Sequence, residues 1–297
     1  MSNLVRILAA IVLFAAGTTA SQAYLILASG TTSVTETVSY GGRQRNVLYI
    51  KPSQSSSTKV PMLVMLHYAG GNPEQMASLT EVSELVRDFG IWVMLPAGVD
   101  GKFNIDPNQS TGVDDVGFIA NRITNAIKKY PILSTKVYMT GYSNGGFEAM
   151  RFACERPAMV AAIAVTTTAL IKQLPCSPAR TVPVAIINGT ADARVDYNST
   201  YGIYSAHGTA EKWASINGCT AAPAHSNLPD LSTSDNSQVT LDAWNGCRNG
   251  SKVWLYSVIG GGHTWPGSPY NAQGLGAVNM DITATLTAWE FVRQFSR

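Results

Sequence analysis

The middle of the chain alternates short apolar runs with segments whose apolar residues recur at helical spacing. The apolar runs are Val60 to Leu66, Ile91 to Leu95, Val137 to Thr140, Val160 to Val165, Val182 to Ile187 and Lys252 to Ile259. Runs without polar alternation are typical of strands that helices cover on both faces of a parallel sheet. The order of the segments therefore predicts an α/β fold with a mainly parallel central sheet.

Helical spacing is found between and after these runs. Pro73 to Phe89 is predicted to form one helix, and a second is predicted from about Asp114 to Lys129, where Asp114 or Asp115 caps the first turn. Further helices are expected at Asn144 to about Cys154, around Ala210 to Ile216, and from Asp281 onward. In the last of these, we expect four apolar residues to pack on the sheet: Ile282, Leu286, Trp289 and Phe295.

Two segments depart from this alternation. Thr35 to Tyr40 and Arg43 to Ile50 alternate apolar and polar residues around Gly41-Gly42, which predicts an N-terminal antiparallel hairpin at the edge of the sheet. Thr220 to Gln238 is rich in Ser, Asn, Asp and Pro, which predicts a surface loop. Since we find no linker-like break, we expect residues 24–297 to form a single domain.

Residues 1–23 have the three-part build of a secretory signal peptide. Arg6 follows a polar start, Ile7 to Gly17 is apolar, and small residues lead to Ser21-Gln22-Ala23. Cleavage after Ala23 is favoured, with Ala20 and Ala28 as alternatives. The apolar run is too short for a stable membrane anchor, because a bilayer requires about 20 residues. The mature protein is therefore expected to be secreted, extracellular or periplasmic.

The net charge and the cysteine content indicate which partners and cross-links to expect. The formal net charge is +2 and charged residues make up 13% of the chain, so nothing favours a nucleic-acid partner, which requires clustered Lys and Arg. In an exported protein, an even number of cysteines predicts disulfides. Three pairings are possible, and sequence neighbours close the shortest loops: Cys154 with Cys176 and Cys219 with Cys247. No C-x-x-C spacing is present, so we expect no metal site and no cofactor.

The segment from Gly141 to Gly146 places a G-x-S-x-G string between an apolar strand and a helix. In that context the string predicts a nucleophile elbow, a sharp turn that presents Ser143 above the sheet edge. A serine hydroxyl is a poor nucleophile near neutral pH, so it requires a nearby base, usually histidine. The four candidates are His67, His207, His225 and His263.

His263 follows three glycines directly after the last strand, which is where this kind of site supplies its base. His67 is expected to shape a loop, and His207 and His225 to lie on the surface. The acid that orients the base should follow a strand between the two, and Asp192 does so. Asp196 is the alternative, although a turn also explains it.

An acyl-transfer site also requires donors directed at the developing oxyanion. The backbone N–H of Asn144, next after Ser143, is expected to be one of them. The second is expected in the loop from His67 to Gly71, with the N–H of Ala69 favoured and that of Tyr68 as the alternative.

With these residues in place, the chain resembles the esterase family that groups secreted poly(3-hydroxybutyrate) depolymerases with the feruloyl and acetylxylan esterases of carbohydrate esterase family 1. Five segments carry the resemblance: Leu66 to Asn72, Val113 to Phe118, Gly141 to Gly146, Asn188 to Tyr197, and Gly260 to Gly267. The resemblance implies the α/β-hydrolase fold and triad roles for Ser143, Asp192 and His263. It also favours the two disulfides between sequence neighbours.

Two aromatic residues are candidate substrate contacts. Tyr68 stands where the family usually has glycine, so its ring is expected to narrow or floor the acyl pocket. Trp265 follows the base closely and is expected either to stack on an aromatic acyl group or sugar, or to anchor its loop.

The resemblance implies hydrolysis, through an acyl-enzyme, of carboxylic esters that are attached to or form an extracellular polymer. Feruloyl, acetyl and polyester substrates all remain open. The alternatives are a non-catalytic binding protein on the same fold and a serine peptidase, since fold alone does not fix function.

Overall fold

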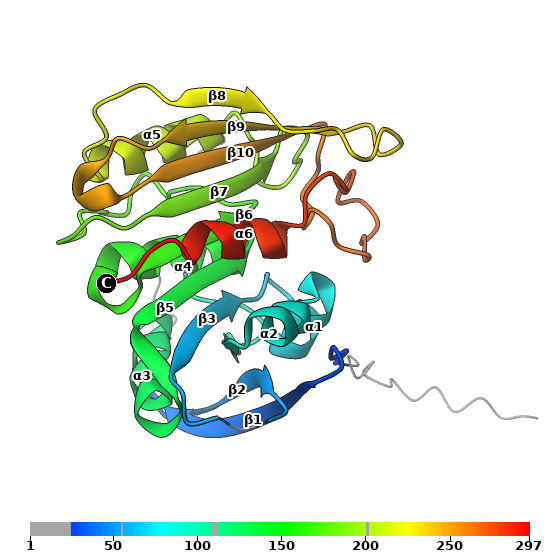
Figure 1. The fold of residues 1–297 in the computed structure, drawn as a ribbon. Coiled ribbons are helices and arrows are strands. Elements are labelled where there is room, and N and C mark those ends of the chain that lie inside the picture. The colour runs from blue at the N-terminus through cyan, green and yellow to red at the C-terminus, as the bar shows by residue number, and fades with distance from the viewer. Residues whose placement is uncertain (1–24, 55, 109–111, 200–201) are drawn as a thin grey trace, which may run out of the picture.

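The computed structural model describes residues 25–54, 56–108, 112–199 and 202–297. The predicted signal peptide, residues 1–23, lies outside these ranges. One sheet crosses the described part of the molecule, with strand order β1-β2-β4-β3-β5-β6-β7-β10-β9-β8 (Figure 1).

The centre of the sheet is parallel, as predicted. Its strands are β4 (Trp92–Pro96), β3 (Val60–Leu66), β5 (Ile132–Tyr142), β6 (Ala162–Thr166), β7 (Val184–Gly189) and β10 (Val253–Ile259). Each is largely buried because helices cover both faces. The carboxyl ends of these strands therefore meet at one edge, where ligand-binding loops of α/β proteins gather.

Antiparallel strands flank the parallel core on both sides. On one side, β1 (Thr31–Tyr40) and β2 (Arg43–Pro52) form the predicted hairpin, and β2 pairs with β4. Gly41 and Gly42 have φ angles of 56° and 76°, which suit the two-residue turn between them. On the other side, β10 pairs with β9 (Gln238–Trp244), and β9 pairs with β8 (Ala224–Asn227).

Alternate residues of the strands feed two separate cores. On one face, α3 (Asp115–Lys129), α4 (Asn144–Glu155) and α5 (Ala206–Ile216) pack against side chains such as Val64 and Ile186. On the other face, α1 (Pro73–Thr80), α2 (Ser83–Phe89) and α6 (Ala284–Val292) pack against Leu63 and Ile187 (Figure 1). Two short 3₁₀ turns, Pro157–Met159 and Arg248–Gly250, complete the elements.

Three expectations from the sequence require correction. The single helix predicted over residues 73–89 is two helices, because Glu81 adopts a left-handed φ of 50° that ends α1. The predicted loop over 220–238 contains β8, whose four residues are all exposed and carry no apolar pattern. Leu286 does not pack on the sheet; it is 44% exposed, because the buried face of α6 carries Trp289 and Phe291 instead.

Two disulfides join the predicted pairs, Cys154 with Cys176 and Cys219 with Cys247. The first links the end of α4 to the segment after β6, and the second links the end of α5 to the end of β9. In the part of the chain that the structure describes, no helix has the length and apolar character needed to span a membrane.

Candidate active site

Ser143 lies at the turn between β5 and α4 with φ 54° and ψ −117°, an unusual backbone conformation for a residue with a side chain. Two glycines make the turn possible. A Cβ on Gly141 would lie 2.3 Å from the backbone oxygen of Gly145, and a Cβ on Gly145 would lie 2.3 Å from that of Leu66. The glycines of the motif therefore allow β5, α4 and the end of β3 to meet, which is the elbow that the sequence predicts.

The structure brings the three predicted side chains together. The Nε2 atom of His263 lies 3.0 Å from Oγ of Ser143, and its Nδ1 atom lies 2.8 Å from Oδ2 of Asp192. The other carboxylate oxygen of Asp192 accepts hydrogen bonds from the backbone N–H groups of Arg194, at 2.8 Å, and Val195, at 2.9 Å. Asp192 and His263 are both buried. This arrangement favours the tautomer with the proton on Nδ1, which leaves Nε2 free to accept the serine proton.

The competing acid and bases have other roles. Asp196 accepts a hydrogen bond from the backbone N–H of Asn198 at 2.9 Å, as expected of a turn residue. The exposed His225 pairs with the buried Asp242, and His207 packs against the ring of Tyr197.

The loops that carry Asp192 and His263 pack through their backbones. A Cβ on Gly189 would lie 2.2 Å from the backbone oxygen of Gly261, so the two loops approach each other more closely than any side chain allows. The N–H of Ala191 donates to the same oxygen at 2.9 Å, and the N–H of His263 donates to the carbonyl of Leu275 at 2.7 Å. Tyr142 adds one side-chain contact, because its hydroxyl donates to the carbonyl of His263 at 2.6 Å.

The loop from His67 to Gly71, which contains Ala69, is held differently. Nε2 of His67 accepts the N–H of Gly98 at 2.9 Å, so Nδ1 carries the proton and donates to the carbonyl of Tyr68 at 2.8 Å. Burial lowers the pKa of His67, which keeps the ring neutral and suits this double role. The N–H of Gly70 also donates to the carbonyl of Gly101 at 2.8 Å. The sequence prediction that His67 shapes its loop agrees with these contacts.

Residues 97–104, which we call the brace loop, also hold the first residue of α4. The side chain of Asn144 accepts the N–H of Phe103 at 2.7 Å and donates to its carbonyl at 3.1 Å. Both residues predicted to supply oxyanion donors, Ala69 and Asn144, are thus positioned against the same loop. The sequence predicted a role only for the backbone of Asn144, and its side-chain role was missed.

A buried ion pair fixes the brace loop in turn. Nη2 of Arg45 lies 2.5 Å from Oδ1 of Asp115 and 2.6 Å from the carbonyl of Ala97. Oδ2 of Asp115 accepts the N–H of Asn104 at 2.6 Å. The guanidinium also stacks 3.8 Å above the ring of Phe118. The segment from Val113 to Phe118, one of the five that carry the family resemblance, therefore holds the brace loop in place through Asp115. Its sequence pattern did not indicate this role.

One further carboxyl is buried near this network. Glu148 lies on α4, where burial raises the pKa of its carboxyl well above the usual value, and Arg151 at 3.8 Å opposes that effect. The described residues include no group of three or more His, Cys, Asp or Glu side chains placed to hold a metal ion.

A cleft of about 860 Å³ opens in front of Ser143 and His263. Tyr68 lines it, half-buried, with its ring packed edge-on against that of Tyr142 at a centroid distance of 5.4 Å. Trp265 also borders the cleft but is only 2% exposed, and its Nε1 donates to Thr285 at 3.0 Å. Of its two expected roles, anchoring the loop therefore fits better than stacking on a substrate.

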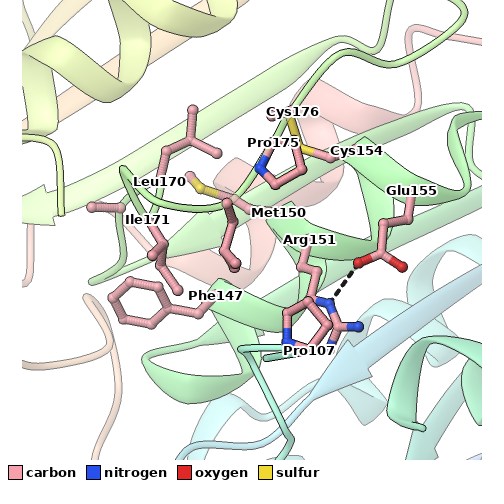
Figure 2. A pocket seen from close by; sticks show the side chains of 12 residues that line it. Pro107, Phe147, Met150, Arg151, Cys154, Glu155, Leu170, Ile171, Pro175 and Cys176 are labelled. Carbon is pink, nitrogen blue, oxygen red and sulfur yellow. Dashed lines mark hydrogen bonds and ion pairs between the residues drawn. A yellow bond between two sulfur atoms is a disulfide. The ribbon is translucent and has the colours of Figure 1, made fainter. Parts of the chain in front are cut away.

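A smaller cavity of about 170 Å³ lies between α4 and the segment after β6, beside the Cys154–Cys176 disulfide. Figure 2 shows Phe147, Met150 and Leu170 around it, with Arg151 and Glu155 paired at its rim. No residue of the Ser143, His263 and Asp192 group lines it.

The fold is that of the α/β-hydrolases, and two solved structures confirm it. A thermostable esterase matches with a TM-score of 0.60 at 16% identity, covering 90% of this chain and 64% of that one. An acetyl xylan esterase from Aspergillus awamori matches with a TM-score of 0.57 at 18% identity, covering 79% and 94%.

The sequence relatives bear esterase names, in agreement with the resemblance found in the sequence. Feruloyl esterase B of Piromyces equi is 28% identical over 270 residues, which cover 85% of this chain and 45% of that protein. The chain thus spans about half of that relative. The putative esterase NocK of Nocardia uniformis subsp. tsuyamanensis is 24% identical over 309 residues, which cover 90% and 84%. No model of a known protein family matches the chain.

Proposed function

We propose that this chain is a serine hydrolase of carboxylic esters, with Ser143 as nucleophile, His263 as general base and Asp192 as the orienting acid. One observation carries the proposal. An unbroken relay runs from Oγ of Ser143 through the ring of His263 to Asp192, with contacts of 3.0 and 2.8 Å. The esterase names of the relatives support the same reaction.

The reaction proceeds in two halves. Oγ of Ser143 attacks the ester carbonyl carbon while its proton passes to Nε2 of His263. The bond from this carbon to the alcohol oxygen then breaks, and His263 returns the proton to the departing alcohol, which leaves an acyl-enzyme. Water attacks the acyl carbon, gives its proton to His263, and the carboxylic acid leaves as Ser143 regains a proton. Asp192 remains ionised and stabilises the imidazolium in both halves.

The backbone N–H groups of Asn144 and Ala69 are proposed as the oxyanion donors. Asn144 is the first residue of α4, so its N–H has no partner within the helix and the helix dipole adds a favourable field for negative charge. Ala69 borders the cleft beside Ser143. Because the brace loop fixes both segments before substrate arrives, the donors require little rearrangement during the reaction.

The proposed substrates are esters carried by an extracellular polymer, with feruloyl and acetyl groups on plant polysaccharide favoured by the names of the relatives. Esters of the poly(3-hydroxybutyrate) type remain within the same chemistry. A single catalytic domain over residues 24–297, released outside the cytoplasm after removal of residues 1–23, completes the proposal. The two disulfides support this location, because disulfides persist in oxidising compartments.

The test compares the mature protein with Ser143→Ala on 4-nitrophenyl acetate, methyl ferulate, acetylated xylan and poly(3-hydroxybutyrate). We expect kcat to fall by at least about 10³-fold, since removal of the nucleophile leaves only binding and oxyanion stabilisation. Ser39→Ala, an exposed serine on β1, is the matched control and should keep full activity. Equal rates for wild type and Ser143→Ala would favour a non-catalytic binding protein, and faster cleavage of peptides than of esters would favour a serine peptidase.

A further inference from the structure

The catalytic cleft contains a single permanent charge. Among the described residues that line it, Arg194 is the only one whose side chain is charged at every physiological pH. The others are aromatic, aliphatic or amide side chains, apart from Ser143, His263 and Thr264. The guanidinium is therefore a candidate binding group for an anionic part of the substrate.

The main chain of Arg194 is fixed by the site itself. Its backbone N–H donates to Oδ1 of Asp192 at 2.8 Å, and the next residue, Val195, does the same at 2.9 Å. Arg194 is exposed, and it takes part in none of the ion pairs found among residues 25–54, 56–108, 112–199 and 202–297. The structure therefore holds the base of this side chain firmly and leaves its charged end available to a ligand.

The charge lies near the reacting atoms. Arg194 lines the same cleft as Ser143 and His263. Its backbone N–H is bonded to Asp192, the carboxylate that contacts His263. A ligand in this cleft can therefore meet Ser143 and the guanidinium at the same time.

The chemistry of the guanidinium specifies the anion. Its planar set of N–H donors matches the two oxygens of a carboxylate, and such charge-assisted bonds are stronger than those between neutral groups. A neutral acetyl or feruloyl ester gives this side chain nothing to bind. An ester whose molecule also carries a free carboxylate gains one directed contact.

We infer that Arg194 selects carboxylate-bearing esters, binding a free acid group of the substrate while Ser143 attacks the ester. The inference rests on the proposed function and narrows its substrate class. The carboxylate could come from the acid end of a hydroxy-acid oligomer or from a uronic acid on a polysaccharide. Both sources present the same group to the guanidinium, so the experiment has one arm for each.

The test measures binding in the Ser143→Ala background, where hydrolysis is expected to be at least about 10³-fold slower. Calorimetry compares the dimer of 3-hydroxybutyrate as its free acid with its methyl ester, and a uronic-acid-bearing xylo-oligosaccharide with its neutral counterpart. We expect the acid of at least one pair to bind about 10-fold more tightly, and raised salt to reduce that preference because the site is open to solvent. Adding Arg194→Gln should abolish the preference, and Arg194→Lys should restore part of it.

Arg43→Gln is the matched control, because Arg43 is an exposed arginine on β2 outside the cleft, and it should leave the preference unchanged. Tighter binding of the free acid of the 3-hydroxybutyrate dimer than of its methyl ester assigns the hydroxy-acid source. Tighter binding of the uronic-acid-bearing xylo-oligosaccharide than of its neutral counterpart assigns the uronic-acid source. Equal binding of acid and neutral molecules in both pairs overturns the inference, as does a preference that survives Arg194→Gln. The hydrolysis assay tests the proposed function separately: equal rates for wild type and Ser143→Ala would contradict that function, whatever the binding assay shows.

Discussion

The two walls of the catalytic cleft reach similar precision by different means. We call the wall with the proposed oxyanion donors the oxyanion wall; it comprises residues 67–71, the brace loop and Asn144. Side chains that bond to backbone groups hold it, namely those of His67, Asn144 and the Arg45–Asp115 pair. The base wall, which comprises residues 189–197 and 260–277, is held mostly by backbone-to-backbone contacts at glycines. The triad spans the two walls between Ser143 and His263.

Because the two walls are held by different contacts, different substitutions should disrupt them. A wall built on glycine contacts tolerates little added volume. A wall built on buried polar side chains tolerates little change of charge, because each unpaired buried group costs free energy. Three substitutions, taken from the largest expected effect to the smallest, test this contrast.

Gly189→Ala should have the largest effect on catalysis, and it acts on the base wall. Its φ needs no glycine, yet the added Cβ would lie 2.2 Å from the backbone oxygen of Gly261 and 2.5 Å from that of Gly262. The loops of Asp192 and His263 must then separate, and a shift of about 1 Å in a catalytic group costs about 10²-fold in rate. We expect kcat on 4-nitrophenyl acetate to fall by about that factor.

Gly246→Ala is the control for volume alone. Its Cβ would meet only Thr220, at an ordinary 3.9 Å. If Gly189→Ala retained the wild-type kcat, the base wall would not depend on close glycine packing.

Asp115→Asn tests the oxyanion wall through its ion pair. The substitution leaves the charge of Arg45 buried without a counter-charge, which should lower the free energy of unfolding by about 3–5 kcal/mol. Urea denaturation measures this loss. The neighbouring Asp114→Asn removes the charge of an exposed helix cap and should cost about 1 kcal/mol or less. Similar losses for the two variants would show that the buried Arg45–Asp115 pair contributes no more to the free energy of unfolding than an exposed helix cap does.

The smallest expected effect concerns pH and His67. Burial lowers its pKa in the folded state below the usual value of about 6.5, so the stability it contributes is present above about pH 6.5 and is lost as pH falls through the folded pKa. A protonated ring would also present an N–H to the N–H of Gly98. Wild type should therefore lose up to about 1.4 kcal/mol per pH unit more than His67→Gln in this window.

Unfolding in urea between pH 7 and pH 4.5 measures the difference. His207→Gln removes an exposed histidine and should follow wild type. Parallel curves for wild type and His67→Gln would show that His67 does not confer this acid sensitivity.

Much of the fold and of the triad could be predicted because their signals are local. Apolar runs located the parallel strands, and G-x-S-x-G and the glycines before His263 located two residues whose loops require those glycines. In the second antiparallel edge, β8 was missed because it is exposed and polar, so burial leaves no pattern in it. The strand β9 was also not predicted, although four of its seven residues are buried. The break at Glu81 was missed because no glycine marks its left-handed conformation.

The support of the oxyanion wall could not be predicted for another reason. Arg45 and Asp115 are 70 residues apart, and Phe103 and Asn144 are 41 apart, so nothing in either local sequence names its partner. A buried charge is visible in a sequence only as a charged residue within an apolar stretch, and many exposed residues look the same.

Both disulfides lie outside the contacts that join the two walls of the cleft. They close loops with separations of 22 and 28 residues, and neither bridge runs from one wall of the cleft to the other. Each one limits the freedom of a local excursion in the unfolded chain. The alignment of Ser143, His263 and Asp192 is thus left to hydrogen bonds and close backbone packing, without a covalent link between the two walls.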